Sequence, residues 1–155
     1  MTTLKKGDKA PEFTATNQDG NQISLSNFKG KSVVLYFYPK DDTPGCTKEA
    51  CSLRDGYEKL KGLGLEVVGV SPDSVASHQK FIAKYNLPFT LISDTERQIA
   101  TTYGVFGEKK MYGKPVMGLH RTTFIINGNG EIAEVISKVD TAEHVDQILK
   151  LLQNK

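Results

Sequence analysis

The run Ser32-Val33-Val34-Leu35-Tyr36-Phe37-Tyr38 decides the fold of this chain. It is almost continuously apolar and rich in β-branched and aromatic residues, which is typical of a central strand covered on both faces. Pro39 ends the strand, because proline has no N–H group to donate to a neighbouring strand. The chain after Pro39 therefore leaves the sheet at the carboxyl end of its central strand.

Strand and helix patterns alternate after this central strand. Short apolar runs predict two further strands, over residues 65–70 and 89–92. Apolar stripes at helical spacing predict three helices, over residues 45–61, 74–85 and 96–103. Residues 104–120 contain four glycines and no clear period, so a long loop is predicted there.

Two β-hairpins and a last helix complete the predicted elements. Residues 12–16 and 22–25 flank the turn signal Asp19-Gly20, and residues 122–126 and 132–136 flank a Gly- and Asn-rich turn. Residues 142–152 carry a final apolar helical stripe. The order predicts an α/β fold, a central mixed sheet flanked by helices with an N-terminal β-hairpin extension.

Length and composition predict one soluble domain over residues 1–155. Twenty basic against 18 acidic residues leave a net charge of +2, which is too balanced to indicate nucleic acid or an anionic membrane as a partner. No apolar run approaches the roughly 20 residues that cross a bilayer. The first six residues lack the apolar core of a secretory signal, so we expect a cytoplasmic protein.

The two cysteines, Cys46 and Cys51, stand five positions apart in a reducing setting, so we expect them to be catalytic, redox-sensing or metal-binding. Cys46 falls in the first turn of the helix that follows the central strand. Free N–H groups and the helix dipole there favour a thiolate, which is the nucleophilic form of cysteine. Thr43 has a hydroxyl that can donate to the sulfur or to a bound oxygen, and Pro39 and Pro44 stiffen the loop.

Cys51 lies off the apolar stripe that contains Cys46. Five residues rotate a helix by about 500°, so the two side chains diverge by about 140° and their Cα atoms lie about 8.6 Å apart. A disulfide requires Cα atoms within about 7 Å. A Cys46–Cys51 disulfide therefore needs the helix to unwind, and we predict different conformations of residues 43–54 in the reduced and oxidised forms.

The spacing Pro39-x-x-x-Thr43-x-x-Cys46 resembles the active-site signature of the peroxiredoxins. The longer string from Tyr36 to Asp55 resembles the bacterioferritin-comigratory-protein, or peroxiredoxin Q, branch, and the similarity runs from Gly7 to the closing helix. The resemblance implies a thioredoxin-like fold and a peroxidase that reduces hydrogen peroxide and organic hydroperoxides. It implies no cofactor and no metal, thioredoxin or a similar dithiol as the reductant, and a monomer.

The same resemblance implies the roles of six residues. Cys46 corresponds to the peroxidatic cysteine, which becomes a sulfenic acid, and Cys51 to the resolving cysteine, which forms an intramolecular disulfide with it. The pocket residues match Pro39 and Thr43, the active-site arginine matches Arg121, and an acidic residue that orients this arginine matches Glu49. Arg121 begins a predicted strand, so it can meet the Cys46 loop across one sheet edge, where a guanidinium would stabilise negative charge.

Each assignment has a simpler competitor. Cys46 fits a buried small side chain, Arg121 an ordinary surface arginine, Glu49 a solvated helix carboxylate, and Cys51 an incidental exposed thiol. A thioredoxin-type reductase would need Cys-x-x-Cys, whereas four residues separate the cysteines here. A peroxide sensor or holdase would have the same active site and stays an alternative.

A metal-binding module is a further alternative, with His78, His120 and His144 as conceivable ligands. None of them has ligand spacing to the cysteines, and two thiolates five helical positions apart do not meet at one tetrahedral centre. We expect His78 to pack inside the protein, His120 to lie in a loop beside Arg121, and His144 to be exposed in the first turn of the last helix.

Overall fold

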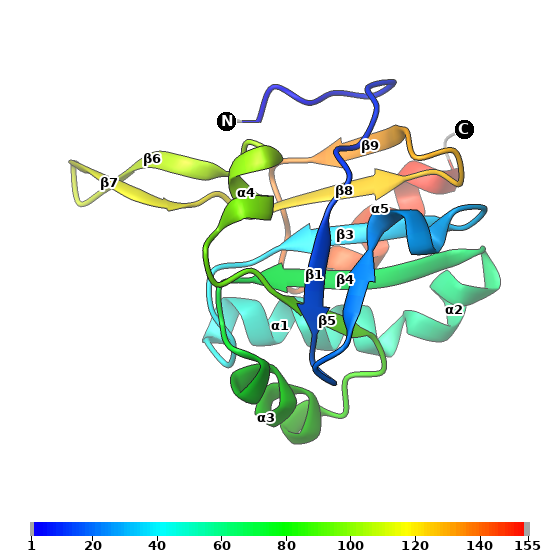
Figure 1. Ribbon diagram of the computed structural model, residues 1–155, viewed down its shortest axis with the longest axis horizontal. Helices are drawn as coiled ribbons and strands as arrows, with labels where there is room; N and C mark the ends of the chain where they lie inside the picture. Colours follow the sequence, from blue (N-terminus) through cyan, green and yellow to red (C-terminus); the bar gives the residue numbers. More distant parts are fainter. Residues whose placement is uncertain (1, 154–155) are drawn as a thin grey trace.

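The computed structural model describes residues 2–153, which form a mixed α/β fold around a central sheet (Figure 1). Within these residues the sheet has seven strands in the order β2-β1-β5-β4-β3-β8-β9. The strands are β1 (Thr14–Asn17), β2 (Gln22–Ser24), β3 (Ser32–Phe37), β4 (Leu65–Ser71), β5 (Thr90–Ser93), β8 (Thr122–Ile126) and β9 (Ile132–Ile136). The helices are the 3₁₀ helix η1 (Leu25–Phe28), α1 (Pro44–Asp55), α2 (Tyr57–Gly62), α3 (Val75–Tyr85), α4 (Gln98–Thr102) and α5 (His144–Gln153).

Strand β3 lies inside the sheet, as its sequence predicts. It pairs in parallel with β4 and antiparallel with β8, and Phe37 stands opposite Thr122 in the second pair. Because the pairing with β8 is antiparallel, the end of β3 and the start of β8 meet at one edge of the sheet. This edge is where the chain turns into α1.

Two hydrophobic layers cover the faces of the sheet, and alternate residues of β3 enter each of them. Val33, Leu35 and Phe37 pack with the N-terminal segment, η1 and α4. Val34 and Tyr36 pack on the other face with α1, α2, α3 and α5. Burial on both faces explains why the sequence of β3 shows no polar alternation.

The N-terminal hairpin forms as predicted, because β1 and β2 pair antiparallel. It is not a separate appendage, since β1 also pairs antiparallel with β5 and joins the main sheet. Among the described residues, the structure has no helix long and apolar enough to cross a membrane.

The predicted long loop over residues 104–120 is wrong, because this segment folds into a hairpin of β6 (Phe106–Met111) and β7 (Lys114–Leu119). The hairpin extends away from the main sheet (Figure 1). Its turn is Tyr112-Gly113, and both residues have positive φ, 53° and 79°. A tyrosine rarely adopts this conformation, so the pair is not a turn signal in the sequence.

The predicted helix over residues 45–61 is two helices, because Gly56 separates α1 from α2. A Cβ atom at position 56 would overlap the side chain of Val145 on α5. Glycine therefore lets α5 approach α1 closely, and the chain bends at the same residue. The predicted helix over residues 96–103 is also shorter, since α4 begins only at Gln98.

Candidate active site

Cys46 lies in the first turn of α1, at the carboxyl end of β3. Thr43 is the N-cap residue in extended conformation, and Pro44 occupies the first helical position, where its missing N–H costs nothing. The Cys46 side chain is 1% exposed and packs in the hydrophobic layer that α1, α2, α3 and α5 form on one face of the sheet. The helix start thus presents unpaired N–H groups around a thiol that is largely shielded from bulk water.

Arg121 reaches Cys46 from the neighbouring strand. It immediately precedes β8, whose first residue stands opposite the last residue of β3. Its Nη2 atom donates a hydrogen bond to Cys46 Sγ at 3.3 Å. The guanidinium also lies against Gly45, where a Cβ atom would stand 3.3 Å from Nη2. A small residue before Cys46 therefore lets the cation approach the sulfur.

Glu49 holds the other side of the same guanidinium. Arg121 Nη1 donates to Glu49 Oε1 at 2.7 Å, and the Glu49 carboxyl is completely buried. Burial raises the pKa of Glu49 from 4.5 to about 7, against the opposing effect of the Arg121 charge. The simpler expectation of a solvated helix carboxylate is therefore wrong, and Glu49 lies one turn behind Cys46 inside the protein.

These three residues form a continuous contact from thiol to carboxyl. The guanidinium is planar and permanently charged, so it can bond to sulfur with one nitrogen and to Glu49 with another. A cation held at this position stabilises a thiolate and any negative charge that develops on an oxygen bound next to it. The arrangement is suited to nucleophilic attack by sulfur on a polar bond.

Thr43 and Pro39 stand at the edge of this arrangement. The Thr43 hydroxyl donates to the Lys40 carbonyl oxygen at 2.9 Å and not to the Cys46 sulfur, and Thr43 is partly exposed. Pro39 is exposed directly after β3. Both residues belong to the loop that connects β3 to Cys46, and the Thr43 hydroxyl closes a turn of that loop.

Cys51 follows Cys46 on the same unbroken helix α1 and is partly buried. Both cysteines are free thiols. The geometry of an intact helix keeps positions i and i+5 too far apart for a disulfide. The structure thus has the conformation expected for the reduced form.

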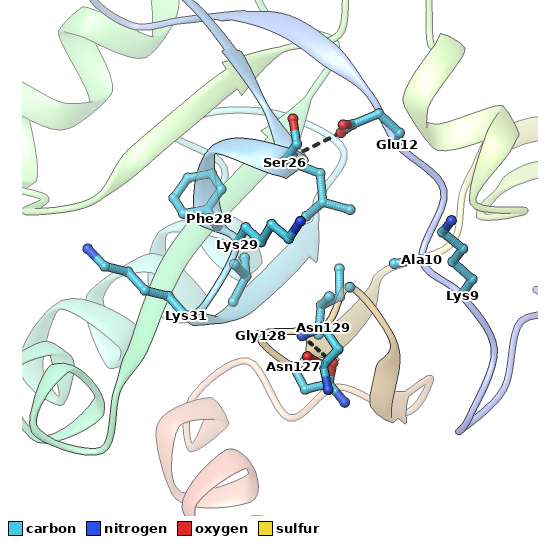
Figure 2. Close-up of a pocket in the computed structure, with 14 residues that line it drawn as sticks. Lys9, Ala10, Glu12, Ser26, Phe28, Lys29, Lys31, Asn127, Gly128 and Asn129 are labelled. Atoms are coloured by element: carbon cyan, nitrogen blue, oxygen red, sulfur yellow. Dashed lines mark hydrogen bonds between the residues drawn. The ribbon is translucent and has the colours of Figure 1, made fainter.

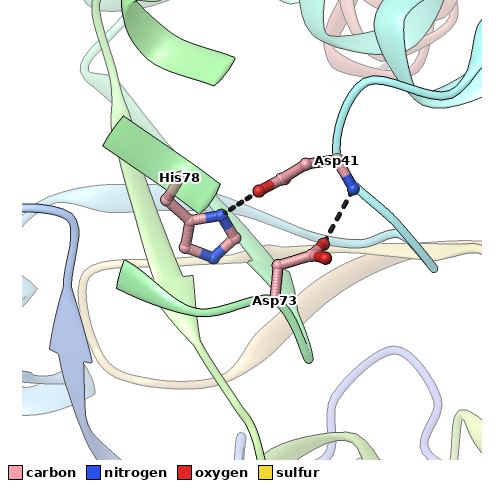
Figure 3. Close-up of side chains that lie close together, drawn as sticks. All are labelled: Asp41, Asp73 and His78. Carbon is pink, nitrogen blue, oxygen red and sulfur yellow. Dashed lines mark hydrogen bonds and ion pairs between the residues drawn. The ribbon is translucent and has the colours of Figure 1, made fainter. Parts of the chain in front are cut away.

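The loop before Cys46 is fastened through a buried aspartate that sequence reasoning missed. Asp41 Oδ1 accepts from the Tyr38 hydroxyl at 2.6 Å, while its Oδ2 lies 2.8 Å from Ser77 Oγ and 2.7 Å from His78 Nδ1. The Asp41 backbone N–H donates to Asp73 at 2.8 Å (Figure 3). These contacts tie the loop to α3 and to the end of β4. An aspartate that follows a fully buried strand was the available signal.

The cluster of Asp41, Asp73 and His78 has oxygen and nitrogen atoms close enough to suggest a cation site. Its short contacts are direct hydrogen bonds, and His78 Nε2 also bonds the Ile92 carbonyl at 2.9 Å. The candidate ligand atoms are therefore already hydrogen-bonded to one another or to backbone and serine groups. The cluster contains neither cysteine, so it differs from the cysteine-containing site that the metal-binding alternative requires.

The three histidines differ in how well they were predicted. His78 is fully buried, as expected. His120 is half-buried beside Arg121 and contacts the Glu108 carbonyl oxygen at 3.1 Å. His144 was expected to be exposed, and this is wrong, because its side chain is completely buried against Glu49 and Thr123.

A cavity of about 290 Å³ lies on the other side of the sheet's length from Cys46, beside the start of β3 and the end of β8 (Figure 2). It is lined by the starts of β3 and η1, by the β8–β9 turn and by side chains that include Lys9, Lys29 and Lys31. None of the residues around Cys46 contributes to it. The cavity is therefore separate from the arrangement of Cys46, Arg121 and Glu49.

The sequence profile of the AhpC/TSA family matches residues 6–135. A putative peroxiredoxin bcp of Coxiella burnetii is 49% identical over 147 residues, which cover 95% of this chain and 97% of the relative. A peroxiredoxin Q structure of Xylella fastidiosa, solved as a cysteine-to-serine mutant, superposes with a TM-score of 0.92 at 31% identity, covering 99% of this chain and 98% of that one. The Xanthomonas campestris bacterioferritin comigratory protein, studied for alkyl peroxide reduction, has a TM-score of 0.88 at 34% identity with the same coverage.

Proposed function

This chain belongs to the AhpC/TSA family and is a peroxiredoxin with a thioredoxin-like fold, and we propose that it reduces hydrogen peroxide and organic hydroperoxides with Cys46 as the attacking thiolate. The observation that supports this role is the 3.3 Å hydrogen bond from Arg121 Nη2 to Cys46 Sγ. The cation is in place before any substrate binds. The alkyl peroxide reduction studied in the Xanthomonas campestris protein supports organic hydroperoxides as substrates.

In the first step the Cys46 thiolate attacks one oxygen of the peroxide. An S–O bond forms and the O–O bond breaks, so that the cysteine is oxidised to a sulfenic acid and the peroxide is reduced. The departing oxygen leaves as hydroxide or alkoxide and takes a proton from solvent. Arg121 stabilises the charge on this oxygen, and Glu49 holds Arg121 in position. The Thr43 hydroxyl and Pro39 shape the loop at which the peroxide binds.

In the second step Cys51 attacks the sulfur of the Cys46 sulfenic acid. An S–S bond forms, the S–O bond breaks, and the oxygen leaves as water with the proton of the Cys51 thiol. This step requires α1 to unwind between the two cysteines. An external dithiol protein of the thioredoxin type then reduces the disulfide by thiol–disulfide exchange. We further propose that residues 1–155 act as one domain, as a cytoplasmic monomer.

Rapid mixing of the reduced protein with hydrogen peroxide tests these roles. We expect Cys46→Ser to abolish peroxide consumption, because the attacking sulfur is lost. Cys51→Ser should consume one equivalent of peroxide and then stop unless another thiol is supplied. Peroxide-dependent oxidation of thioredoxin by Cys46→Ser would refute the assignment, and the absence of a Cys46–Cys51 disulfide from the peroxide-treated wild type would refute the resolving role.

A further inference from the structure

His144 is the first residue of α5 and is completely buried behind the active-site carboxyl. Its Nε2 atom lies 2.8 Å from the Thr123 hydroxyl oxygen and 3.4 Å from Glu49 Oε2. Its Nδ1 atom lies 2.9 Å from Gln147 Oε1. The imidazole therefore continues the line of contacts from Cys46 through Arg121 and Glu49 into the interior of the protein.

The surroundings of Gln147 determine which nitrogen of His144 holds a hydrogen. Gln147 Oε1 accepts from the Asp140 backbone N–H at 2.8 Å, and Gln147 Nε2 donates to the Lys138 carbonyl oxygen at 3.0 Å. The amide cannot be reversed without losing both bonds. Its oxygen thus faces His144 Nδ1, which must donate. In neutral His144 the lone pair is on Nε2, the atom nearest to Glu49.

Glu49 Oε2 is buried and has no hydrogen-bond donor among the described residues. Arg121 bonds only the other oxygen of the carboxyl. If Glu49 were ionised beside a neutral His144, a buried carboxylate oxygen with no donor among the described residues would lie 3.4 Å from a nitrogen that carries no hydrogen. One proton on either atom removes this conflict.

We propose that His144 is a positioning residue of the peroxidase, which with Glu49 holds one proton between Nε2 and Oε2 and thereby leaves the charge of Arg121 available to Cys46. While this proton is present, the three side chains Arg121, Glu49 and His144 together have one positive charge. When it leaves, Glu49 is ionised beside neutral His144, and its charge cancels that of Arg121. The thiolate and the departing peroxide oxygen then lose part of their stabilisation.

The groups around the pair agree with a single retained proton. Burial raises the pKa of Glu49 to about 7, and burial lowers the pKa of His144, so both groups favour their neutral forms. Tyr36 from β3 faces Glu49, and burial raises its pKa well above the usual range, so that it stays neutral. Asp140 acts on His144 from before α5, but its carboxylate accepts from the Ala142 and Glu143 backbone N–H groups. Arg121 is the charged neighbour that acts on both groups.

This inference rests on the proposed roles of Cys46 and Arg121, and its test isolates the first chemical step. The rate constant for oxidation of Cys46 by hydrogen peroxide is measured from pH 5 to 9 in the Cys51→Ser background. We expect the parent protein to lose about tenfold in rate as the shared proton leaves, the size of effect that one nearby charge produces. His144→Gln offers a permanent amide donor to Oε2, so it should lack this alkaline decline and react slowly at every pH.

His78→Gln is the matched control, because it removes another fully buried imidazole that has no contact with Glu49 or Arg121. It should show the alkaline decline at the same pH as the parent. An unchanged decline in His144→Gln would overturn the inference. The proposed function would fail separately, through peroxidase activity that survives Cys46→Ser.

Nitrogen NMR of His144 tests the same inference without relying on activity. In the wild-type protein we expect a hydrogen on Nδ1 and a single transition of Nε2 near the pH of the rate decline. The transition should disappear in Glu49→Gln. A neutral His144 with its hydrogen on Nε2 would overturn the shared proton even if the rate profiles agreed with it. The same would follow from an Nε2 transition that is unchanged in Glu49→Gln.

Discussion

Glu49 is the completely buried partner of Arg121, so we expect its charge to set how much positive charge Arg121 presents to Cys46. A carboxyl in this position is expensive to ionise, because its desolvation is only partly offset by the guanidinium. The active site therefore retains a group that prefers to be protonated near neutral pH. The cost of this group should be visible in the stability of the whole protein.

The pKa of Glu49 rises from 4.5 in the unfolded chain to about 7 in the folded protein, so the native state binds more protons between these pH values. Its contribution to the free energy of unfolding is fully present below pH 4.5 and is lost as pH rises through 7. The loss amounts to about 3 kcal/mol. Glu49→Gln should remove it, so that urea unfolding at pH 5 and pH 8 gives more similar stabilities than in the wild type.

Glu58→Gln is the control for that measurement, because Glu58 is an exposed carboxylate on α2. It should leave the wild-type difference between pH 5 and pH 8 intact. If Glu49→Gln also left the difference intact, the carboxyl would titrate equally in the folded and unfolded states, and the proposed burial effect would be absent.

At the scale of elements, the relation between α1 and α3 sets how easily the catalytic segment can unwind. The loop before α1 is held to α3 by Asp41, whose carboxylate has contacts with Ser77 and His78. Its neighbour Asp42 bonds Lys84 and Tyr85 at the far end of the same helix. If the Cys46–Cys51 disulfide forms as proposed, α1 has to unwind against this attachment.

Asp41→Asn should therefore accelerate disulfide formation. It weakens a buried, charge-assisted contact worth about 1–3 kcal/mol in the intact form, and this contact need not persist after unwinding. We expect the conversion of sulfenic acid to disulfide, followed by quenched-flow mass spectrometry, to become several-fold faster. Overoxidation of Cys46 at high peroxide should fall correspondingly, because the sulfenic acid is shorter-lived.

Asp42→Asn provides the comparison within the same loop. Asp42 is exposed and pairs with an exposed lysine, and such pairs contribute little. The rate of disulfide formation in Asp42→Asn should therefore stay close to that of the wild type. Equal rates in both variants and the wild type would mean that contacts elsewhere limit the unwinding.

At the scale of the whole molecule, oxidation should lower the stability of the fold. A disulfide across so short a loop restricts the unfolded chain by about 2 kcal/mol. Unwinding the first turns of α1 withdraws the buried side chains of Cys46 and Ala50 and several helix hydrogen bonds, which together are worth about 4 kcal/mol. The loss exceeds the gain, so calorimetry should give a lower Tm for the peroxide-treated protein than for the reduced one.

Cys51→Ser is the control, since it cannot form the intramolecular disulfide. Its Tm should not respond to one equivalent of peroxide in the way the wild type does. Amide hydrogen exchange should localise the change to residues 43–54. An oxidised protein with the same Tm and the same exchange profile as the reduced one would contradict the requirement for unwinding.

How much of this molecule was predictable depends on the range of the interactions involved. Short-range apolar patterns were enough to predict β3 and the helix that starts near Cys46, because each pattern arises within one element. The β6–β7 hairpin escaped prediction because its turn uses a tyrosine with positive φ. The division of the long helix at Gly56 depends on Val145, which is distant in sequence.

The predictability of the candidate site also depends on the range of the interactions. The proximity of Arg121 to Cys46 followed from the expectation that the strand after Arg121 begins at the sheet edge where β3 ends, and the structure places the two side chains in contact. The burial of His144 was not predictable, because the first turn of an amphipathic helix gives no sign of which neighbour covers it. The role of Asp41 could not be predicted, because its partners Ser77 and His78 lie on α3, more than 30 positions along the chain.

The boundary at Gly56 has a consequence for how this protein can change over evolutionary time. In the proposed mechanism the segment that unwinds lies within residues 43–54, before Gly56, and α2 begins a separate helix beyond it. Under this mechanism we expect selection for fast turnover to act on the residues before that boundary, and selection for a stable scaffold to act on those after it. A single glycine thus lets two opposing demands be adjusted by different sets of mutations.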